Sequence, residues 1–368
     1  MKPRTTLILL VLAVVVFALG WIVQNHNASK ESTSLRAGRL AFPDLAAKLD
    51  GAERIEITRQ GGKVTLLRKG NQWLIVERSD YPALSGKTHA LLAGLAALRL
   101  VEPRTTDSAF YDRLGVDDPN KPASGSTLLK VYDGGGKVLA ELIVGNKHAS
   151  PQPNLPDEIY VRKPDDQQSW LAEGKLDADT DSSNWMNHDI ISIDHAKIAK
   201  IDVERGNEKL ELVRNGDRFE LKVPADHPSL DSNALDQVAR ALEFVSFTDV
   251  KPVKEEPGVP LASAVFTTDD GLVVTVKTNK AEKDALWVTF SVSGSGKAKE
   301  EADKLKHVLE GWAYQIGSWK ERALAPTLSD LKSVSAPTAS SAPPATSEAA
   351  PARKPAAEPA SNGQSPGK

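Results

Sequence analysis

The sequence predicts an α+β fold made of two tandem copies of a mostly antiparallel sheet-plus-helix unit, preceded by one transmembrane helix and followed by a disordered tail. Three observations predict it. An uncharged apolar run lies near the N-terminus, the pattern of residues 55–84 recurs at residues 201–230, and the last part of the chain is dominated by Ala, Pro and Ser.

The composition excludes several classes of protein. The 368 residues include 46 Lys and Arg, 49 Asp and Glu, and no cysteine. This near-neutral balance gives no electrostatic basis for nucleic-acid binding. The lack of cysteine excludes disulfides, thiol nucleophiles, iron–sulfur clusters, cysteine zinc sites and a lipoprotein anchor.

The N-terminal segment predicts a membrane anchor. Residues 7–23 carry no charge and would span about 25 Å as a helix, which matches a bilayer core. Lys2 and Arg4 precede the run, so the positive-inside rule places residues 1–6 in the cytoplasm. Residues 24–51 then form a linker, and the body lies in the periplasm or outside. The predicted location is the bacterial inner membrane, crossed once.

A cleaved signal peptide is the alternative interpretation of this segment. Its apolar region would be shorter, and it would end at a small-residue cleavage site. The best cut, after Ala28, places His26 where a small residue is preferred. We therefore predict an uncleaved signal anchor.

The body contains an internal repeat that aligns without a gap over its first part. The matching pairs are Ile55 and Ile201, Ile57 and Val203, Val64 and Leu210, Leu66 and Leu212, Arg68 and Arg214, Gly70 and Gly216, Trp73 and Phe219, Pro82 and Pro228, and Leu84 and Leu230. Apolar and polar residues alternate in both copies, which predicts three strands with one solvated face, hence an antiparallel sheet. Asn215-Gly216 is a strong hairpin signal.

A helix is predicted after each set of strands. Ser85 and Asp231 occupy equivalent positions, and both are good N-cap residues. An apolar stripe follows each cap. The stripes are Leu91, Leu92, Leu95 and Leu98 in the first copy, and Leu235, Val238, Leu242 and Val245 in the second.

The later parts of the copies match with small deletions. Two strands flank Asp133-Gly134 and Asp270-Gly271, and then residues 159–161 parallel residues 286–288. Short helical stretches lead to Trp185 and Trp319. The copies are therefore predicted at 52–193 and 198–326. Trp73, Tyr160, Phe219 and Trp287 fall at strand positions and are interpreted as core rather than as a sugar-stacking platform.

Residues 333–368 predict a disordered tail. Val334 is the only large aliphatic residue there, so little apolar surface is available to offset the entropy of ordering. A solubilising role is the plain interpretation. A wall-spanning or partner-binding role is the alternative.

Two groups of residues were weighed as chemical sites. His188, Asp189, Asp194 and His195 flank a predicted strand, but adjacent strand residues point to opposite faces. Asp177, Asp179 and Asp181 resemble the start of a calcium loop, yet Ser182 and His188 stand where an EF-hand needs Gly and Glu. We interpret both groups as solvated surface. No catalytic, cofactor-binding or metal-ligating residue is predicted.

The order of these motifs resembles a known family over about residues 50–250. The motifs are Gln72-Trp73, Pro82 before the Leu91–Leu98 helix, Tyr111 to Pro119, Leu142 to Gly145, Ile159 to Val161, and Trp185 ahead of Ile190-Ile191. Together they are similar to the bacterial domain-of-unknown-function family 4340. The resemblance implies a membrane helix with an extracytoplasmic body and an association with ABC-type export or gliding-motility systems. It brings no catalytic residue set.

We therefore predict a non-enzymatic, single-pass membrane-anchored scaffold or accessory protein of an envelope or ABC-type transport complex. Its expected partners are the membrane and an envelope protein such as an ABC-type transporter, with no nucleic acid and no cofactor. The alternative is an envelope ligand-binding protein that uses the cleft between the two copies for a glycan or peptide. A hydrolase with an unrecognised site is a third hypothesis.

Overall fold

The computed structural model describes residues 38–148 and 157–333. The anchor predicted at residues 7–23 and the tail after Ser333 lie outside the described residues. In the part of the chain that is described, no helix has the length and apolar character needed to cross a membrane.

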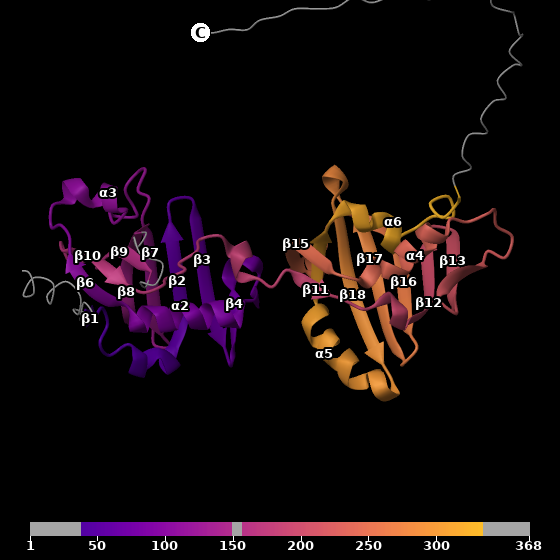
Figure 1. Ribbon diagram of the computed structural model, residues 1–368, viewed down its shortest axis with the longest axis horizontal. Helices are drawn as coiled ribbons and strands as arrows, with labels where there is room; N and C mark the ends of the chain where they lie inside the picture. Colours follow the sequence, from indigo (N-terminus) through magenta and orange to yellow (C-terminus); the bar gives the residue numbers. More distant parts are fainter. Residues whose placement is uncertain (1–37, 149–156, 334–368) are drawn as a thin grey trace, which may run out of the picture. The chain divides into compact units, whose positions relative to one another are not determined.

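The first sheet has ten strands, and every pairing in it is antiparallel (Figure 1). One of them, β1, comes from residues 24–51, which were predicted as a linker but pair with β6 here. Its order is β1-β6-β10-β9-β8-β7-β2-β3-β4-β5. The strands are β1 (Arg39–Leu40), β2 (Ala52–Arg59), β3 (Gly62–Lys69), β4 (Gln72–Ile75), β5 (Tyr81–Pro82), β6 (Arg99–Pro103), β7 (Thr127–Asp133), β8 (Val138–His148), β9 (Glu158–Arg162) and β10 (Ser169–Glu173).

A second, nine-stranded antiparallel sheet follows, with the order β11-β15-β19-β18-β17-β16-β12-β13-β14. Its strands are β11 (Asp189–Ile191), β12 (Ile198–Arg205), β13 (Glu208–Asn215), β14 (Arg218–Val223), β15 (Val245–Pro252), β16 (Val259–Thr268), β17 (Leu272–Lys280), β18 (Leu286–Gly294) and β19 (Trp312–Ile316). The helices of the two copies are α2 (Ser85–Ala97), α3 (Tyr111–Leu114), α4 (Ser232–Ala239), α5 (Lys299–Leu309) and α6 (Glu321–Leu324).

The two sheets repeat one strand order. Nine strands of the first sheet, from β1 to β4, correspond one by one to the nine strands of the second, and β5 is an addition at one edge. The register repeats too, because Ile57 opposes Val64 as Val203 opposes Leu210. The predicted duplicated, mostly antiparallel α+β body is therefore confirmed.

Alternation of apolar and polar residues places the expected side chains in the core. Trp73 and Phe219 are both buried, each on the third long strand of its copy. Val223, which the alternation also places on the apolar face of this strand, is 40% exposed at the end of β14. Tyr160 is only half-buried, whereas Trp287 lies in the core.

Several boundaries differ from the sequence prediction. β11 pairs with β15 of the second sheet, although residues 190–193 were placed in the first copy. Asp231 caps α4 by accepting the N–H of Asn233, but Ser85 is the first helical residue and caps nothing. α4 ends at Ala239, so Leu242 and Val245 are buried beyond the α-helix rather than on it.

Gly94 lies in the middle of α2, where glycine normally costs helix stability. A Cβ at this position would overlap the backbone carbonyl oxygen of Lys175, which belongs to the loop after β10. The glycine therefore permits a close approach between the helix and this loop.

Gly94→Ala is expected to lower the free energy of unfolding by about 1–3 kcal/mol, because overpacking against backbone outweighs the gain in helix propensity. Gly86→Ala is the matched control, since a Cβ at position 86 of the same helix meets no atom within 4 Å. Urea unfolding followed by circular dichroism measures both variants. A stabilised Gly94→Ala protein would contradict the close-approach explanation.

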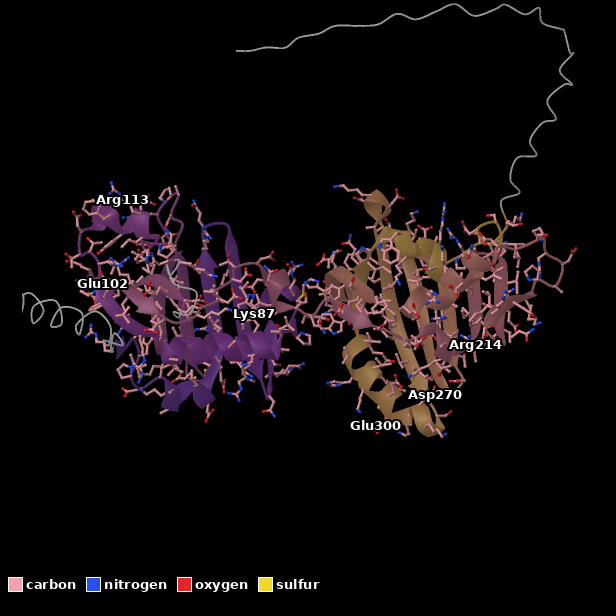
Figure 2. The ribbon with its side chains drawn as sticks, in the orientation of Figure 1. Lys87, Glu102, Arg113, Arg214, Asp270 and Glu300 are labelled. Carbon is pink, nitrogen blue, oxygen red and sulfur yellow. The ribbon has the colours of Figure 1, made fainter. Side chains whose placement is uncertain are left out.

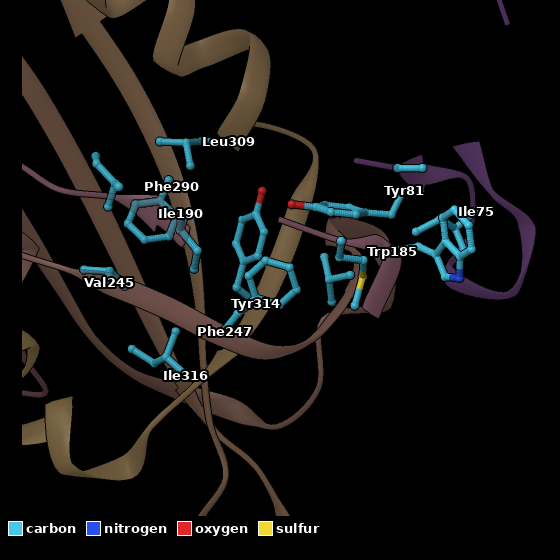
Figure 3. Packing of buried hydrophobic residues seen from close by; sticks show 14 of the residues in the cluster. Ile75, Tyr81, Trp185, Ile190, Val245, Phe247, Phe290, Leu309, Tyr314 and Ile316 are labelled. Carbon is cyan, nitrogen blue, oxygen red and sulfur yellow. The ribbon is translucent and has the colours of Figure 1, made fainter. Parts of the chain in front are cut away.

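Aromatic side chains from both sheets meet at Tyr81 of β5 (Figure 3). Its ring centroid lies 5.7 Å from that of Phe247 and 4.9 Å from that of Trp312, both in edge-to-face geometry. Nearby, Arg78 donates to the Asp249 carboxylate at 2.6 Å. These contacts join the end of the first meander to β15 and β19.

Candidate functional site

The structure brings Asp194 and His195 together with two residues that lie far along the chain. His195 Nδ1 is 2.7 Å from Glu243 Oε1, and its Nε2 is 2.9 Å from the Arg240 guanidinium. One tautomer satisfies both contacts, with Nδ1–H donating to Glu243 and Nε2 accepting from Arg240. Both ring nitrogens of His195 are therefore engaged in hydrogen bonds within the chain.

This cluster has the donor types of a metal site. One ligand atom each from Asp194, His195 and Glu243 lie within 4.8 Å of one another. However, Arg240 already supplies a positive charge, at 3.2 Å from Glu243 Oε2. Asp194 also caps the turn His195–Lys197 by accepting the Ala196 N–H. A metal would have to displace the Arg240 contacts and the Nδ1 proton.

Electrostatics around Glu243 agree with an ion-pair cluster. Partial burial raises the pKa of its carboxyl, but hydrogen bonds from the His195 backbone and ring, with Arg240, outweigh burial and hold the pKa below its usual range. Arg214 also binds the carbonyl oxygens of His195 and Ile198 (Figure 2). The cluster thus fixes the turn before β12 to the end of the helical segment 232–242.

His188 and Asp189 belong to separate contacts. The His188 Nδ1 and Nε2 atoms are each 2.9 Å from a backbone carbonyl oxygen, those of Phe247 and Ser183. Asp189 is exposed at the start of β11. The His188 ring therefore has different partners from the His195 ring.

Lys87 of α2, which is labelled in Figure 2, forms ion pairs with the acidic loop that was considered as a calcium site. Its ammonium lies 3.2 Å from an Asp177 oxygen and 3.4 Å from an Asp179 oxygen. Asp181 caps the turn Ser182–Trp185. The carboxylates are therefore already occupied by internal donors.

Hydrogen bonding explains the acidity of Asp179. Partial burial raises the pKa of its carboxyl, but the Asp181 N–H, the Asn184 amide and Lys87 together hold that pKa below its usual value. This loop is held by its own donors rather than left open for a cation.

Sequence analysis missed two exposed aromatic side chains in the second copy. Phe244 is 82% exposed, and its backbone has a φ of +49°. Trp319 is 75% exposed, although its repeat partner Trp185 is fully buried. Lys320, the residue after Trp319, links the two segments. Its side chain is buried and donates to the carbonyl oxygens of Ala241 and Glu243, the latter directly before Phe244. Burial lowers its pKa.

Trp319 also lines an open depression of about 570 Å³ in the second copy. The other lining residues are all polar or charged: Arg205, Ser318, Glu321, Arg322, Thr327 and Asp330. The only sequence signal for this place was the alignment of Trp319 with Trp185, which says nothing about exposure.

Fold and sites together define a duplicated antiparallel α+β protein whose polar clusters are paired with donors of the same chain and whose second copy exposes aromatic side chains. The family described as Domain of unknown function (DUF4340) matches residues 73–263. The chain belongs to this family, and the match begins in β4 of the first sheet and ends in β16 of the second. A search among curated proteins found none that matches the chain.

Proposed function

We propose that the chain is a non-enzymatic, membrane-tethered scaffold or accessory protein outside the bacterial inner membrane, where it binds an envelope protein. The partner class suggested by the family resemblance is a component of an ABC-type transport complex. The tether is the apolar run at residues 7–23, and the binding surface is centred on Phe244.

Phe244 is the observation that carries this proposal. A bulky side chain in the left-handed region costs about 1–2 kcal/mol, and exposing the ring forfeits its hydrophobic burial as well. Strained residues of this kind cluster where function requires them. Buried aromatic anchors also supply much of the energy of protein–protein interfaces.

The surroundings of Phe244 hold its backbone in place. The Phe244 N–H donates to the Ser192 hydroxyl at 3.2 Å, and Lys320 donates to the preceding carbonyl, that of Glu243, at 2.8 Å. His195 and Arg240 fix the Glu243 side chain. An aromatic ring presented on a rigid backbone loses little entropy on binding, which favours recognition of a partner.

The pairing of these acidic and histidine side chains with cations of the same chain supports a role without catalysis. Lys87 occupies the acidic loop, and Arg240 occupies the His195 cluster. Catalytic groups must instead converge on a point that a substrate can reach. Tethering adds to the proposal because it raises the effective concentration of a weak binder at a membrane-bound partner.

Phe244→Gly is expected to raise the free energy of unfolding by about 1 kcal/mol, because glycine adopts a positive φ without steric cost. The same change is expected to reduce binding of the envelope partner at least tenfold, which corresponds to about 1.4 kcal/mol. Val259→Ala is the control, since Val259 is 67% exposed on β16 and should change neither quantity.

A photo-crosslinking amino acid placed at position 244 in cells tests the scaffold role directly. We expect one defined protein adduct that comes from the membrane fraction and disappears when residues 1–24 are replaced by a cleavable signal. The same amino acid at Phe110, an exposed ring of the first copy, is the control. An adduct that is equally strong from the untethered body, or from position 110, would contradict the proposal.

A further inference from the structure

The two tryptophans that the sequence aligns differ in their surroundings. Trp185 lies in the turn Ser182–Trp185, well beyond the end of β10 at Glu173, whereas Trp319 lies in the turn Ser318–Lys320 directly after β19. Trp185 is fully buried, and its Nε1–H donates to the Asp179 carbonyl at 3.0 Å. Trp319 presents its ring to solvent. The exposure of Trp319 is therefore not shared by the tryptophan with which the sequence aligns it.

The exposed indole is held in a defined place by its neighbours. A Cβ at Gly317 would lie 2.7 Å from Cδ1 of Trp319, so the indole occupies the space that any other side chain at 317 would fill. The backbone of Gly317, with φ −59° and ψ 129°, is open to any residue. Glycine at position 317 is therefore required by the space that the Trp319 ring occupies and not by the backbone conformation of the turn. The Lys320 ammonium lies 5.0 Å from the ring centroid, within cation–π range.

The depression beside the indole carries balanced charge and fixed polar groups. Arg205 donates to Glu321 at 3.1 Å and to the Ala325 carbonyl. Asp330 accepts from the Thr327 N–H at 2.9 Å and from the Thr327 hydroxyl at 2.6 Å. Arg322 lies 3.8 Å from Asp330 and is otherwise exposed. Lys280 also lies 3.0 Å from Glu321 and 3.3 Å from Asp284, so three cations stand against three carboxylates here.

From these observations we infer that the depression is a binding site for a neutral oligosaccharide. A sugar ring presents a face of C–H groups that can lie on an indole, and its edge carries hydroxyls that both donate and accept hydrogen bonds. The indole supplies a large apolar face, whereas Arg322, Asp330 and Ser318 supply donors and acceptors at the rim. The balanced charge disfavours a phosphate or sulfate ligand, which would require an excess of cations.

The saccharide site lies within the second copy. It is independent of the proposed scaffold role, which is argued from Phe244. It also differs from the cleft between the copies that the sequence suggested for a glycan or peptide, because every residue lining the depression belongs to residues 205–330. Its failure would leave the scaffold proposal unchanged.

Titration of the full chain with maltotetraose, cellotetraose and chitotetraose tests the inference, in a detergent without a sugar headgroup. Isothermal calorimetry or ligand-observed NMR measures the binding. We expect saturable binding of at least one tetrasaccharide with a dissociation constant of about 1 mM, a value typical of a small open site. Trp319→Ala should weaken binding at least tenfold. Gly317→Ala should also weaken it, because the added methyl group displaces the indole.

Phe110→Ala is the matched control, since this exposed ring of the first copy lies outside the depression and should leave binding unchanged. Three results would overturn the inference: no saturable binding of any neutral tetrasaccharide, equal binding by Trp319→Ala, or binding only of a sulfated heparin tetrasaccharide. Binding of a peptide of residues 334–353 in place of any sugar would also overturn it and would identify the chain's own Pro-rich segment as the occupant.

Discussion

Trp185→Ala is expected to lower the free energy of unfolding by about 3–5 kcal/mol, whereas Trp319→Ala changes it by less than about 0.5 kcal/mol. Trp185 is completely buried (Figure 3), and its backbone carbonyl accepts the Leu84 N–H at 2.7 Å. Lys87 lies 4.7 Å from its ring centroid. Truncation would leave a large cavity next to α2 and remove an anchor of the acidic loop.

Urea unfolding followed by far-ultraviolet circular dichroism measures both variants without depending on tryptophan emission. The pair is informative because the same substitution removes a fully buried ring in one case and a 75% exposed ring in the other. Equal destabilisation by the two substitutions would contradict the difference in burial on which both the fold description and the saccharide site depend.

Trp73→Ala and Phe219→Ala are each expected to cost about 3–5 kcal/mol, as truncations of buried aromatic side chains. Both residues lie on the last strand of the meander at one end of their sheet, where Trp73 opposes Arg68 and Phe219 opposes Arg214 on the neighbouring strand. The rings pack in the apolar core. The same unfolding measurement applies.

Val138→Ala serves as the control for this second pair, because Val138 is 42% exposed on β8. A cost for either aromatic variant that matches this control would show that the ring is not part of the core. It would then also contradict the equivalence of the two copies.

Local pattern was sufficient to predict the long strands and the duplication. One buried face imposes a period of two on β2, β3, β12 and β13, and each copy repeats that pattern in the same order. β1 could not be predicted in this way, because a strand of two residues is too short to show a period. A strand was predicted where β11 lies, but its sheet was not. The places of these two strands follow from pairing with β6 and β15, which is a tertiary effect.

The candidate sites depended on contacts between distant parts of the chain. Asp194 and His195 were visible as a cluster, but Glu243 and Arg240, which complete it, lie in another element. Lys87 similarly comes from α2 to reach the acidic loop. Sequence could align Trp319 with Trp185, but it could not show that Gly317 makes room for an indole at the surface.

The separation of the two sheets along the chain has a consequence for biosynthesis. Every strand of the first sheet, from β1 to β10, precedes every strand of the second. The strand pairing of the first sheet therefore needs no residue that is synthesised after β10. A ribosome completes the first sheet's sequence before it begins β11, and domains generally fold as units in that order. Non-local pairings within each sheet are thereby confined to one half of the chain, which limits the time for which unpaired edges are exposed to other nascent chains.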